Sequence, residues 1–481
     1  MGGRNPTVKQ AVWDFIEKWP VYQRDTTDPL LYLDDEERSV LQGQLLQRQI
    51  KWLAEGSKYY QRKFQEWGLE PGDVRSTADL EKIPLTGKKD YMAQPEDFIL
   101  RLPQATIYDN LWQVSYTTGT TTGKPTPFYS TSYDYYAKLL QFRRRCKVSW
   151  MTPEDVQVSI MPLGALPHIA YFGVLDNSPA LSGPAIMTCV GSRHPDFDVH
   201  NSMDHAIATI EKFRANVVYS LTSYARRLLM RAQEQSRDFS PVKSIWVSGE
   251  PCSKGLRDDI RQRFAALGAK NVFVANGFAC TELQGTLPEC CEFSGSHNSS
   301  PDLFFLEVVD EQGKRLPDGQ RGLLAITHLN RRGTALLRYL TGDLVVLTNE
   351  PCPFCGRPGQ RLLPMDGNSY AVRTQELLKV KSTLINPAVL TEVMAGIPEV
   401  EEYQIVIEKE DRHDPYSPDR MLIRVAARVN DREALVKVIT EGIKNACEIK
   451  PEIEFTEPQQ IYDAASAAKA RRIIDLRPNL S

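Results

Sequence analysis

Strand-like and helical segments alternate between about residues 132 and 274, and this alternation constrains the fold more than any other feature. Strand-like runs lie at Val156–Met161, Val217–Leu221, Ile245–Val247 and Val272–Val274. Helical patterns lie at Ser132–Val148, His205–Phe213, Ser223–Gln235 and Gly255–Leu267. Because strands that alternate with helices build a parallel sheet, we predict an α/β fold with mainly parallel sheets flanked by helices.

The segments before and after this region predict further parts. Apolar residues recur at helical spacing from Asp34 to about Trp67, and closely spaced strands begin at Phe304. The last 110 or so residues read β-α-β-β-α-β, after a turn-rich stretch at Pro364–Ser369. We therefore predict a large N-terminal domain over 1–367, with a β-rich subdomain at about 285–365, and a small α+β C-terminal domain over 368–481.

Composition excludes several classes of protein. The 481 residues are 42% hydrophobic and 25% charged, with a formal net charge of −3. This balance gives no electrostatic basis for binding nucleic acid or an anionic membrane, and no apolar run is long enough to span a bilayer. The nine scattered cysteines are not a disulfide framework, so we expect a cytoplasmic protein. Whether the chain forms a homodimer stays open.

A polar loop at residues 115–129 indicates phosphate binding. It contains six threonines, two glycines and one lysine between apolar flanks. Glycines let the backbone approach an anion, and hydroxyls, backbone N–H groups and a lysine suit phosphate oxygens. The loop is not a P-loop, because Gly119 and Gly123–Lys124 have the wrong spacing and Pro125 follows the lysine. Its candidate phosphate-binding residues are Thr118, Gly119, Thr120, Thr121, Thr122, Gly123 and Lys124.

Further motifs follow in order along the chain. They are Ser248-Gly-Glu-Pro-Cys-Ser, Phe278-Ala-Cys-Thr-Glu282, Tyr339-Leu-Thr-Gly-Asp343-Leu and Ala468-Lys469-Ala-Arg-Arg-Ile-Ile-Asp-Leu-Arg. Together with the threonine-rich loop, this series resembles the adenylate-forming superfamily of acyl- and aryl-CoA synthetases. It is most similar to the phenylacetate–CoA ligase branch, over nearly the full length of the chain.

The resemblance implies a role for each motif. Glu282 would hold Mg²⁺, Lys124 would follow the phosphates, and Lys469 would be the mobile catalytic lysine. Asp343 would accept hydrogen bonds from both ribose hydroxyls. The remaining nucleotide-binding candidates are Ser248, Gly249 and Glu250 beside the adenine, Phe278 stacked on it, Thr281 beside Glu282, and Arg373 at the hinge.

Some positions depart from the family pattern. Ala279 and Ala468 replace glycines, and the hinge is poorly kept: counting back from Pro387 places it at Arg373, whereas counting forward from Cys355 points to Gly367. The acid pocket is less defined. Ala275 and Ala279 are small enough to leave room for an aromatic ring, and His168 lies where such enzymes often place pocket residues.

Cysteine and histidine residues predict a metal site apart from catalysis. Cys352-Pro-Phe-Cys355-Gly has the spacing of a zinc knuckle, and Cys290-Cys291 with His297 lies about 55 residues upstream. A Cys3His set would fill all four positions of a structural Zn²⁺. By family spacing Cys290 is the better ligand, with Cys291 as the rival.

The sequence therefore predicts an ATP-dependent ligase that joins a small, preferably aromatic, carboxylic acid to coenzyme A through an acyl-adenylate. The expected cofactors are ATP, Mg²⁺, coenzyme A and structural Zn²⁺. Two alternatives stay open. The acyl group could pass to a carrier-protein thiol or an amine, or the chain could be a non-catalytic nucleotide-binding scaffold.

Overall fold

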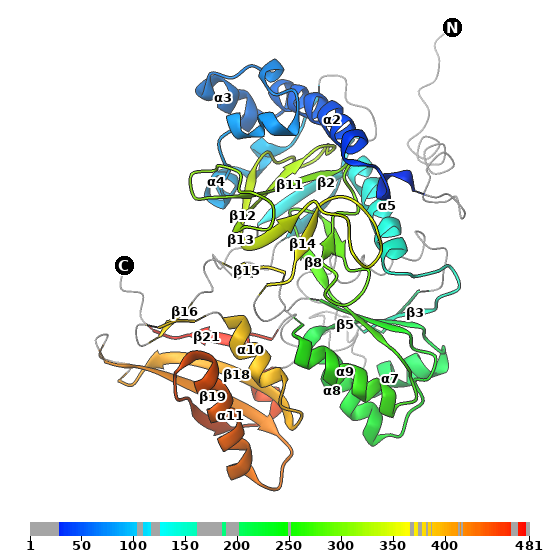
Figure 1. The fold of residues 1–481 in the computed structure, drawn as a ribbon, viewed down its shortest axis with the longest axis vertical. Coiled ribbons are helices and arrows are strands. Elements are labelled where there is room, and N and C mark those ends of the chain that lie inside the picture. The colour runs from blue at the N-terminus through cyan, green and yellow to red at the C-terminus, as the bar shows by residue number, and fades with distance from the viewer. Residues whose placement is uncertain are drawn as a thin grey trace. The chain divides into compact units, whose positions relative to one another are not determined.

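The computed structural model describes residues 28–102, 109–116, 126–160, 185–188, 202–248, 252–365, 370–373, 378–380, 383–385, 387–411, 414, 417–462 and 470–477. The chain divides into two compact units (Figure 1). Unit 1 comprises Met1–Glu154, Leu175–Pro184 and Gly277–Leu363, and unit 2 comprises Asp155–Val174, Ala185–Asn276 and Pro364–Ser481.

Unit 1 begins with helices. They are η2 (Pro29–Leu31), α2 (Asp35–Gly56), α3 (Lys58–Trp67), η3 (Pro71–Asp73), η4 (Thr77–Lys82), α4 (Lys88–Ala93), η5 (Pro95–Phe98) and α5 (Ser132–Val148). The helical pattern at Asp34–Trp67 is two helices rather than one, and the break lies at Ser57. The Ser57 hydroxyl accepts from the backbone of Tyr60, which caps α3, and donates to the carbonyl of Asp97 at 2.8 Å.

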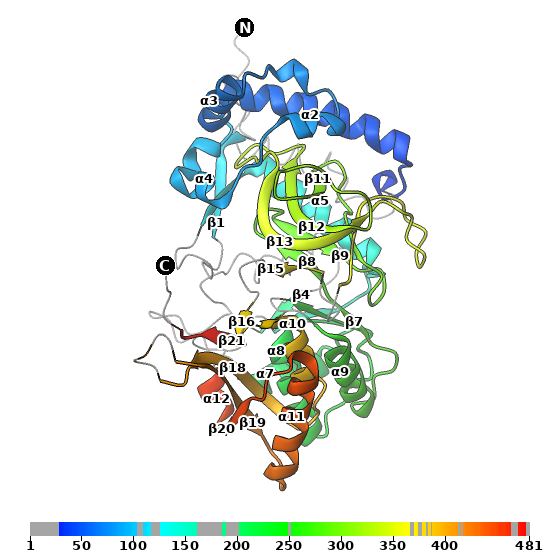
Figure 2. The same ribbon diagram turned by 60° about the vertical axis from the view of Figure 1, so that its left-hand side comes forward.

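The sheets of unit 1 are antiparallel. The largest runs in the order β10-β14-β13-β12-β11, and its strands β11, β12 and β13 are labelled in Figure 2. The strands of this unit are β1 (Leu111–Tyr116), β2 (Pro127–Thr131), β8 (Gly277–Cys280), β9 (Gly285–Pro288), β10 (Ser296–His297), β11 (Phe304–Val309), β12 (Arg321–His328), β13 (Tyr339–Thr348) and β14 (Arg361–Leu363). One hydrophobic core joins α2 and α3 to the segment before β13, and it includes Leu46, Ile50, Tyr60, Leu336, Leu337 and Tyr339. The predicted β-rich subdomain is therefore an antiparallel sheet.

The first part of unit 2 is a parallel sheet. Its order is β4-β3-β5-β6-β7, and every pair in it is parallel. The strands are β3 (Gln157–Ser159), β4 (Ala185–Met187), β5 (Val217–Leu221), β6 (Ser244–Ser248) and β7 (Phe273–Ala275), and the helices between them are α7 (Met203–Lys212), α8 (Thr222–Glu234) and α9 (Lys254–Ala266). The alternation of strands and helices in the sequence thus correctly predicted a parallel sheet.

The C-terminal part of unit 2 has a mixed sheet in the order β20-β19-β18-β21. The helices and strands in this part of the chain are β15 (Val372–Arg373), β16 (Leu378–Val380), β17 (Thr383–Ile385), α10 (Pro387–Ala395), β18 (Val400–Lys409), β19 (Asp419–Ala427), α11 (Arg432–Cys447), β20 (Glu452–Phe455), α12 (Pro458–Ile461) and β21 (Ile473–Asp475). Strands β16 and β17 form a separate two-stranded sheet. Helices α10 and α11 pack on it through Leu390, Met394, Leu435, Ile439 and Ile443. The α+β character predicted for this segment agrees with the structure.

The predicted domain boundary at 367/368 stays a prediction, because the two compact units divide the chain differently. Among the helices that the structure describes, none combines the length and the apolar character that a membrane span requires.

Candidate functional site

The β8–β9 hairpin carries the Phe278-to-Glu282 motif. Strands β8 and β9 pair antiparallel, with Phe278 opposite Leu287, so Glu282 lies in the turn at the tip. Gly277 is required at the base, because a Cβ there would lie 2.4 Å from the carbonyl oxygen of Leu287. Phe278 and Glu282 are each 8% exposed, whereas Ala279 faces solvent. The hairpin therefore holds an aromatic ring and a carboxylate on one short, tightly built element.

Two buried residues that we did not identify from the sequence hold the tip of this hairpin. His328, at the end of β12, contacts the carbonyl oxygen of Glu282 through Nε2 at 2.8 Å. Arg331 donates from Nη2 to the carbonyl of Leu283 at 3.0 Å and from Nη1 to Oε1 of Gln284 at 3.3 Å. The Ser130 hydroxyl also donates to Gln284, at 2.6 Å. The backbone under Glu282 is thus fixed from outside the hairpin.

The hydrogen bonds of His328 define its tautomer. Nδ1 accepts from the backbone N–H of Leu336 at 3.2 Å, so the ring proton sits on Nε2 and is donated to Glu282. Burial, followed by the neighbouring Arg331 charge, lowers the pKa of His328 from 6.5 to about 3. The ring is therefore neutral at physiological pH and serves as a fixed donor.

Asp343 lies in a bulge of strand β13. The pairing of β12 with β13 moves from Leu323 opposite Leu344 to Ala325 opposite Leu340, so extra residues of β13 lie between the two pairs. Gly342 occupies this bulge with φ of +82°, a conformation that favours glycine. Asp343 is 3% exposed, and its backbone N–H donates to the Thr341 hydroxyl at 3.2 Å. Strand β13 begins at Tyr339, so the whole Tyr339-to-Asp343 motif lies within the strand.

Ser248 and Ala275 lie near each other in the parallel sheet of unit 2. They end the neighbouring strands β6 and β7, where Trp246 pairs with Ala275. The Asn276 amide donates to the carbonyl of Val247 at 3.2 Å, which ties the two strand ends together. Because ligands of parallel α/β sheets bind beyond the carboxyl ends of the strands, this edge fits the predicted adenine and acid contacts.

Several predicted residues lie outside the described part of the chain. They are Thr118, Gly119, Thr120, Thr121, Thr122, Gly123, Lys124, His168, Gly249, Glu250 and Lys469. For Arg373, at the end of β15, only the backbone is described, and the rival hinge position Gly367 is not described. Their roles stay predictions.

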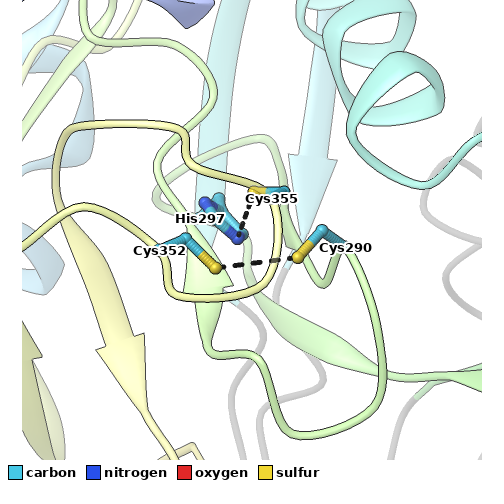
Figure 3. A group of neighbouring side chains, drawn as sticks. All are labelled: Cys290, His297, Cys352 and Cys355. Atoms are coloured by element: carbon cyan, nitrogen blue, oxygen red, sulfur yellow. Dashed lines mark hydrogen bonds between the residues drawn. The ribbon is translucent and has the colours of Figure 1, made fainter.

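The four predicted metal ligands converge at one place in unit 1 (Figure 3). The ligand atoms of Cys290, His297, Cys352 and Cys355 all lie within 4.8 Å of one another. The sulfur atoms of Cys290 and Cys352 are 3.8 Å apart, and Cys355 Sγ lies 3.9 Å from His297 Nε2. Two thiolates on a tetrahedral Zn²⁺, with bonds of about 2.3 Å, lie roughly 3.8 Å apart. The residues thus fit a structural zinc, and Cys290 rather than Cys291 belongs to the group.

The backbone around the cluster is shaped to present these ligands. Gly356 has φ of +70° and donates its N–H to the carbonyl of Cys352 at 2.8 Å, which closes the Cys-x2-Cys-Gly knuckle. Ser294 accepts from the backbone N–H of Cys290 at 3.1 Å and of Cys291 at 3.3 Å. Leu31, next to the N-terminal helix α2, packs against the cluster. The site therefore joins segments that are distant in the sequence.

The groups of the cluster shift the pKa values of its thiols in opposite directions. Contact with Cys355, together with burial, raises the pKa of the Cys290 thiol. Contact with Cys290 and with the His297 ring lowers the pKa of Cys355 well below its ordinary value. A metal that binds here would take thiolates and release their protons.

Comparison with known proteins assigns the family. The family described as AMP-binding enzyme matches residues 62–330, more than half of the chain, and the family described as AMP-binding enzyme C-terminal domain matches residues 383–477. The chain belongs to the AMP-binding enzyme family.

Individual relatives agree with this assignment. This AMP-binding enzyme is 29% identical over 477 residues to phenylacetate-coenzyme A ligase of Thermus thermophilus, covering 92% of this chain and 98% of that protein. It is 24% identical to phenylacetate-coenzyme A ligase of Aromatoleum evansii, covering 94% and 97%. The crystal structure of 2-hydroxyisobutyryl-CoA ligase in its postadenylation state has a similar fold, with a TM-score of 0.75, 23% identity and coverage of 93% and 92%. The resemblance to the phenylacetate–CoA ligase branch and the predicted α/β fold are therefore confirmed.

Proposed function

We propose that this AMP-binding enzyme is an ATP-dependent carboxylic acid–CoA ligase that forms an acyl-adenylate and releases pyrophosphate and AMP. The observation that carries this proposal is the near full-length similarity to phenylacetate-coenzyme A ligases. The same similarity favours an aromatic acid as substrate. The small side chain of Ala275, at the end of β7, is in keeping with a ring beside it.

The chemistry explains why the site needs these residue types. A carboxylate is a poor electrophile, and its attack on the α-phosphate of ATP makes AMP the leaving group in the next step. This attack brings two anions together, so cations must offset the charge that develops. We assign that role to Lys469 and Lys124, and we assign the ribose hydroxyls to the buried carboxylate of Asp343.

Glu282 is the residue we assign to Mg²⁺. A carboxylate oxygen is a ligand that Mg²⁺ prefers, and the cation would neutralise phosphate charge when bound. The contacts of His328 and Arg331 with the hairpin tip favour this role, because a rigid backbone keeps the carboxylate at one place. Likewise, Cys290, His297, Cys352 and Cys355 would hold a structural Zn²⁺, whose four positions would all be filled by protein.

Pyrophosphate release tests the proposal. Purified protein with ATP and Mg²⁺ should release pyrophosphate only when a suitable acid is present, and coenzyme A should then yield the thioester. A panel of benzoate, phenylacetate, indole-acetate, naphthoate and a fatty acid would identify the substrate class, and we expect an aromatic acid to give at least about tenfold higher kcat/KM than the fatty acid.

Other results would point to the alternatives. Acid-dependent release that coenzyme A neither accelerates nor converts to thioester would favour a carrier-protein thiol or an amine as acceptor. Absence of release with every acid, in protein that still binds ATP, would favour a non-catalytic nucleotide-binding role.

A further inference from the structure

The predicted metal cluster and the β8–β9 hairpin are adjacent in the chain and in space. Strand β9 ends at Pro288, and Cys290 follows two residues later. The short segment 290–297 then ends in strand β10, which contains the ligand His297. Cys290 and His297 therefore close this segment at both ends when they share a metal.

Ser296 connects that segment to the hairpin. Its hydroxyl accepts a hydrogen bond from the backbone N–H of Phe278 at 3.1 Å, and the residue is completely buried. Successive side chains of a strand point to opposite faces, so Ser296 faces Phe278 while its neighbour His297 faces the cluster. One strand of two residues thus contacts both the metal site and the motif assigned to the adenine.

The strand that carries Ser296 lies at the edge of the largest sheet of unit 1. β10 pairs only with β14 among the described strands, through Ser296 opposite Leu362 and His297 opposite Arg361. Strand β14 follows the knuckle that supplies Cys352 and Cys355. A metal bound by all four ligands would therefore fix β10 from its own side and from the side of its partner strand.

We propose that the Cys290–His297–Cys352–Cys355 metal site positions Phe278 for the adenine of ATP, and that Ser296 transmits this effect through its hydrogen bond to the Phe278 backbone. The proposal rests on the proposed function and on the proposed metal. Ser296 is a positioning residue, since it acts through Phe278. Without the hydroxyl, the buried N–H of Phe278 loses its partner and the base of the hairpin loses its restraint.

Replacement of Ser296 tests the connection. Ser296→Ala should keep the metal content of the wild-type protein and should raise KM for ATP roughly fivefold to tenfold, because a buried donor is left unsatisfied. The KM for the acid should stay unchanged. As product inhibitors, AMP should bind more weakly by the same factor, whereas pyrophosphate should bind as before. A general loss of stability would not separate the two inhibitors in this way.

Ser299→Ala is the matched control. Ser299 lies two residues after the 290–297 segment and is 3% exposed, and its hydroxyl has no hydrogen-bond partner among the described residues. The control should leave KM for ATP and inhibition by AMP at wild-type values. Equal values for Ser296→Ala and Ser299→Ala would overturn the proposal.

Metal removal supplies the second arm. Chelation of the wild-type protein should weaken AMP inhibition by a similar factor, and chelation of Ser296→Ala should add little, because both changes act on one connection. Fully additive effects would contradict the proposal. If the metal-free protein unfolds, the comparison of Ser296→Ala with Ser299→Ala still tests whether the hydrogen bond to Phe278 affects binding of the nucleotide. If the wild-type protein binds neither ATP nor AMP, the proposed function itself fails, which is a different outcome.

Discussion

At the scale of single residues, the site depends on buried polar side chains that hold backbone groups. His328 and Arg331 donate to the backbone carbonyls of Glu282 and Leu283, the residues at the tip of the hairpin. They lie in Thr327-His-Leu-Asn-Arg331, a stretch without a catalytic pattern in the sequence. The signal that could have identified them is weak: a histidine and an arginine inside an apolar strand-and-turn segment need partners.

The low pKa of His328 predicts a pH dependence of stability. The unfolded histidine binds a proton near pH 6.5 and the folded one only near pH 3, so stability is complete above pH 6.5 and falls as the pH decreases. Between pH 7 and pH 5 this residue should lower the free energy of unfolding by about 2 kcal/mol.

Urea unfolding of wild type and His328→Gln at both pH values measures the effect. Glutamine keeps a donor and an acceptor but does not titrate, so the wild-type protein should lose about 2 kcal/mol more than the variant between pH 7 and pH 5. An equal loss in both proteins would show that His328 is not buried in a neutral state.

At the scale of elements, β13 combines a sheet strand with a site. Buried and partly exposed residues alternate regularly along β13 through Asp343, while the bulge at Gly342 takes residues 341–343 out of register with β12. The run Thr341-Gly-Asp343 does not by itself show whether these residues lie in a turn or within a strand. Only the pairing with β12 decides that the run lies within the strand, because the bulge is a property of two strands together.

Gly342→Ala tests the bulge. A side chain at φ of +82° is strained by about 1 kcal/mol, and relief of this strain should move Asp343. We expect KM for ATP to increase at least about tenfold, in addition to the loss of stability. The control is Gly319→Ala, which has φ of +79° in open space within a turn between β11 and β12. It should lose similar stability and keep the wild-type KM; an unchanged KM in Gly342→Ala would contradict the role of the bulge.

At the scale of the whole molecule, the metal cluster connects parts of unit 1 that are far apart in the chain. Cys290 and His297 follow the hairpin, Cys352 and Cys355 lie between β13 and β14, and Leu31 at the N-terminal side packs on them. A metal that binds only the folded state stabilises it by mass action. A metal held by these four residues would therefore stabilise the long-range contacts of the antiparallel sheet.

Metal removal should lower the thermal stability of the protein. We expect about one zinc per chain by elemental analysis and a decrease in Tm of at least about 5 °C after chelation, restored by added Zn²⁺. Cys291→Ser should keep both the metal and the Tm, since Cys291 lies outside the ligand group. Purified protein without bound metal, or an unchanged Tm after its removal, would contradict the assignment.

Local patterns in the sequence determined the elements and the family. Helices such as α5 and α11, and the alternation of β5, α8, β6 and α9, follow from side-chain periodicity and capping, which act over a few residues. The order of the motifs indicated the branch, and the cysteine spacing predicted the four residues that come together in the cluster, up to the choice between Cys290 and Cys291.

Tertiary structure alone decided which distant groups meet. It placed Cys290 in the cluster, His328 and Arg331 under the hairpin tip, Ser296 against Phe278, and the break between α2 and α3 at Ser57. The physical reason is that a buried polar group must find its partner wherever the packed chain brings one, and sequence spacing does not encode that partner.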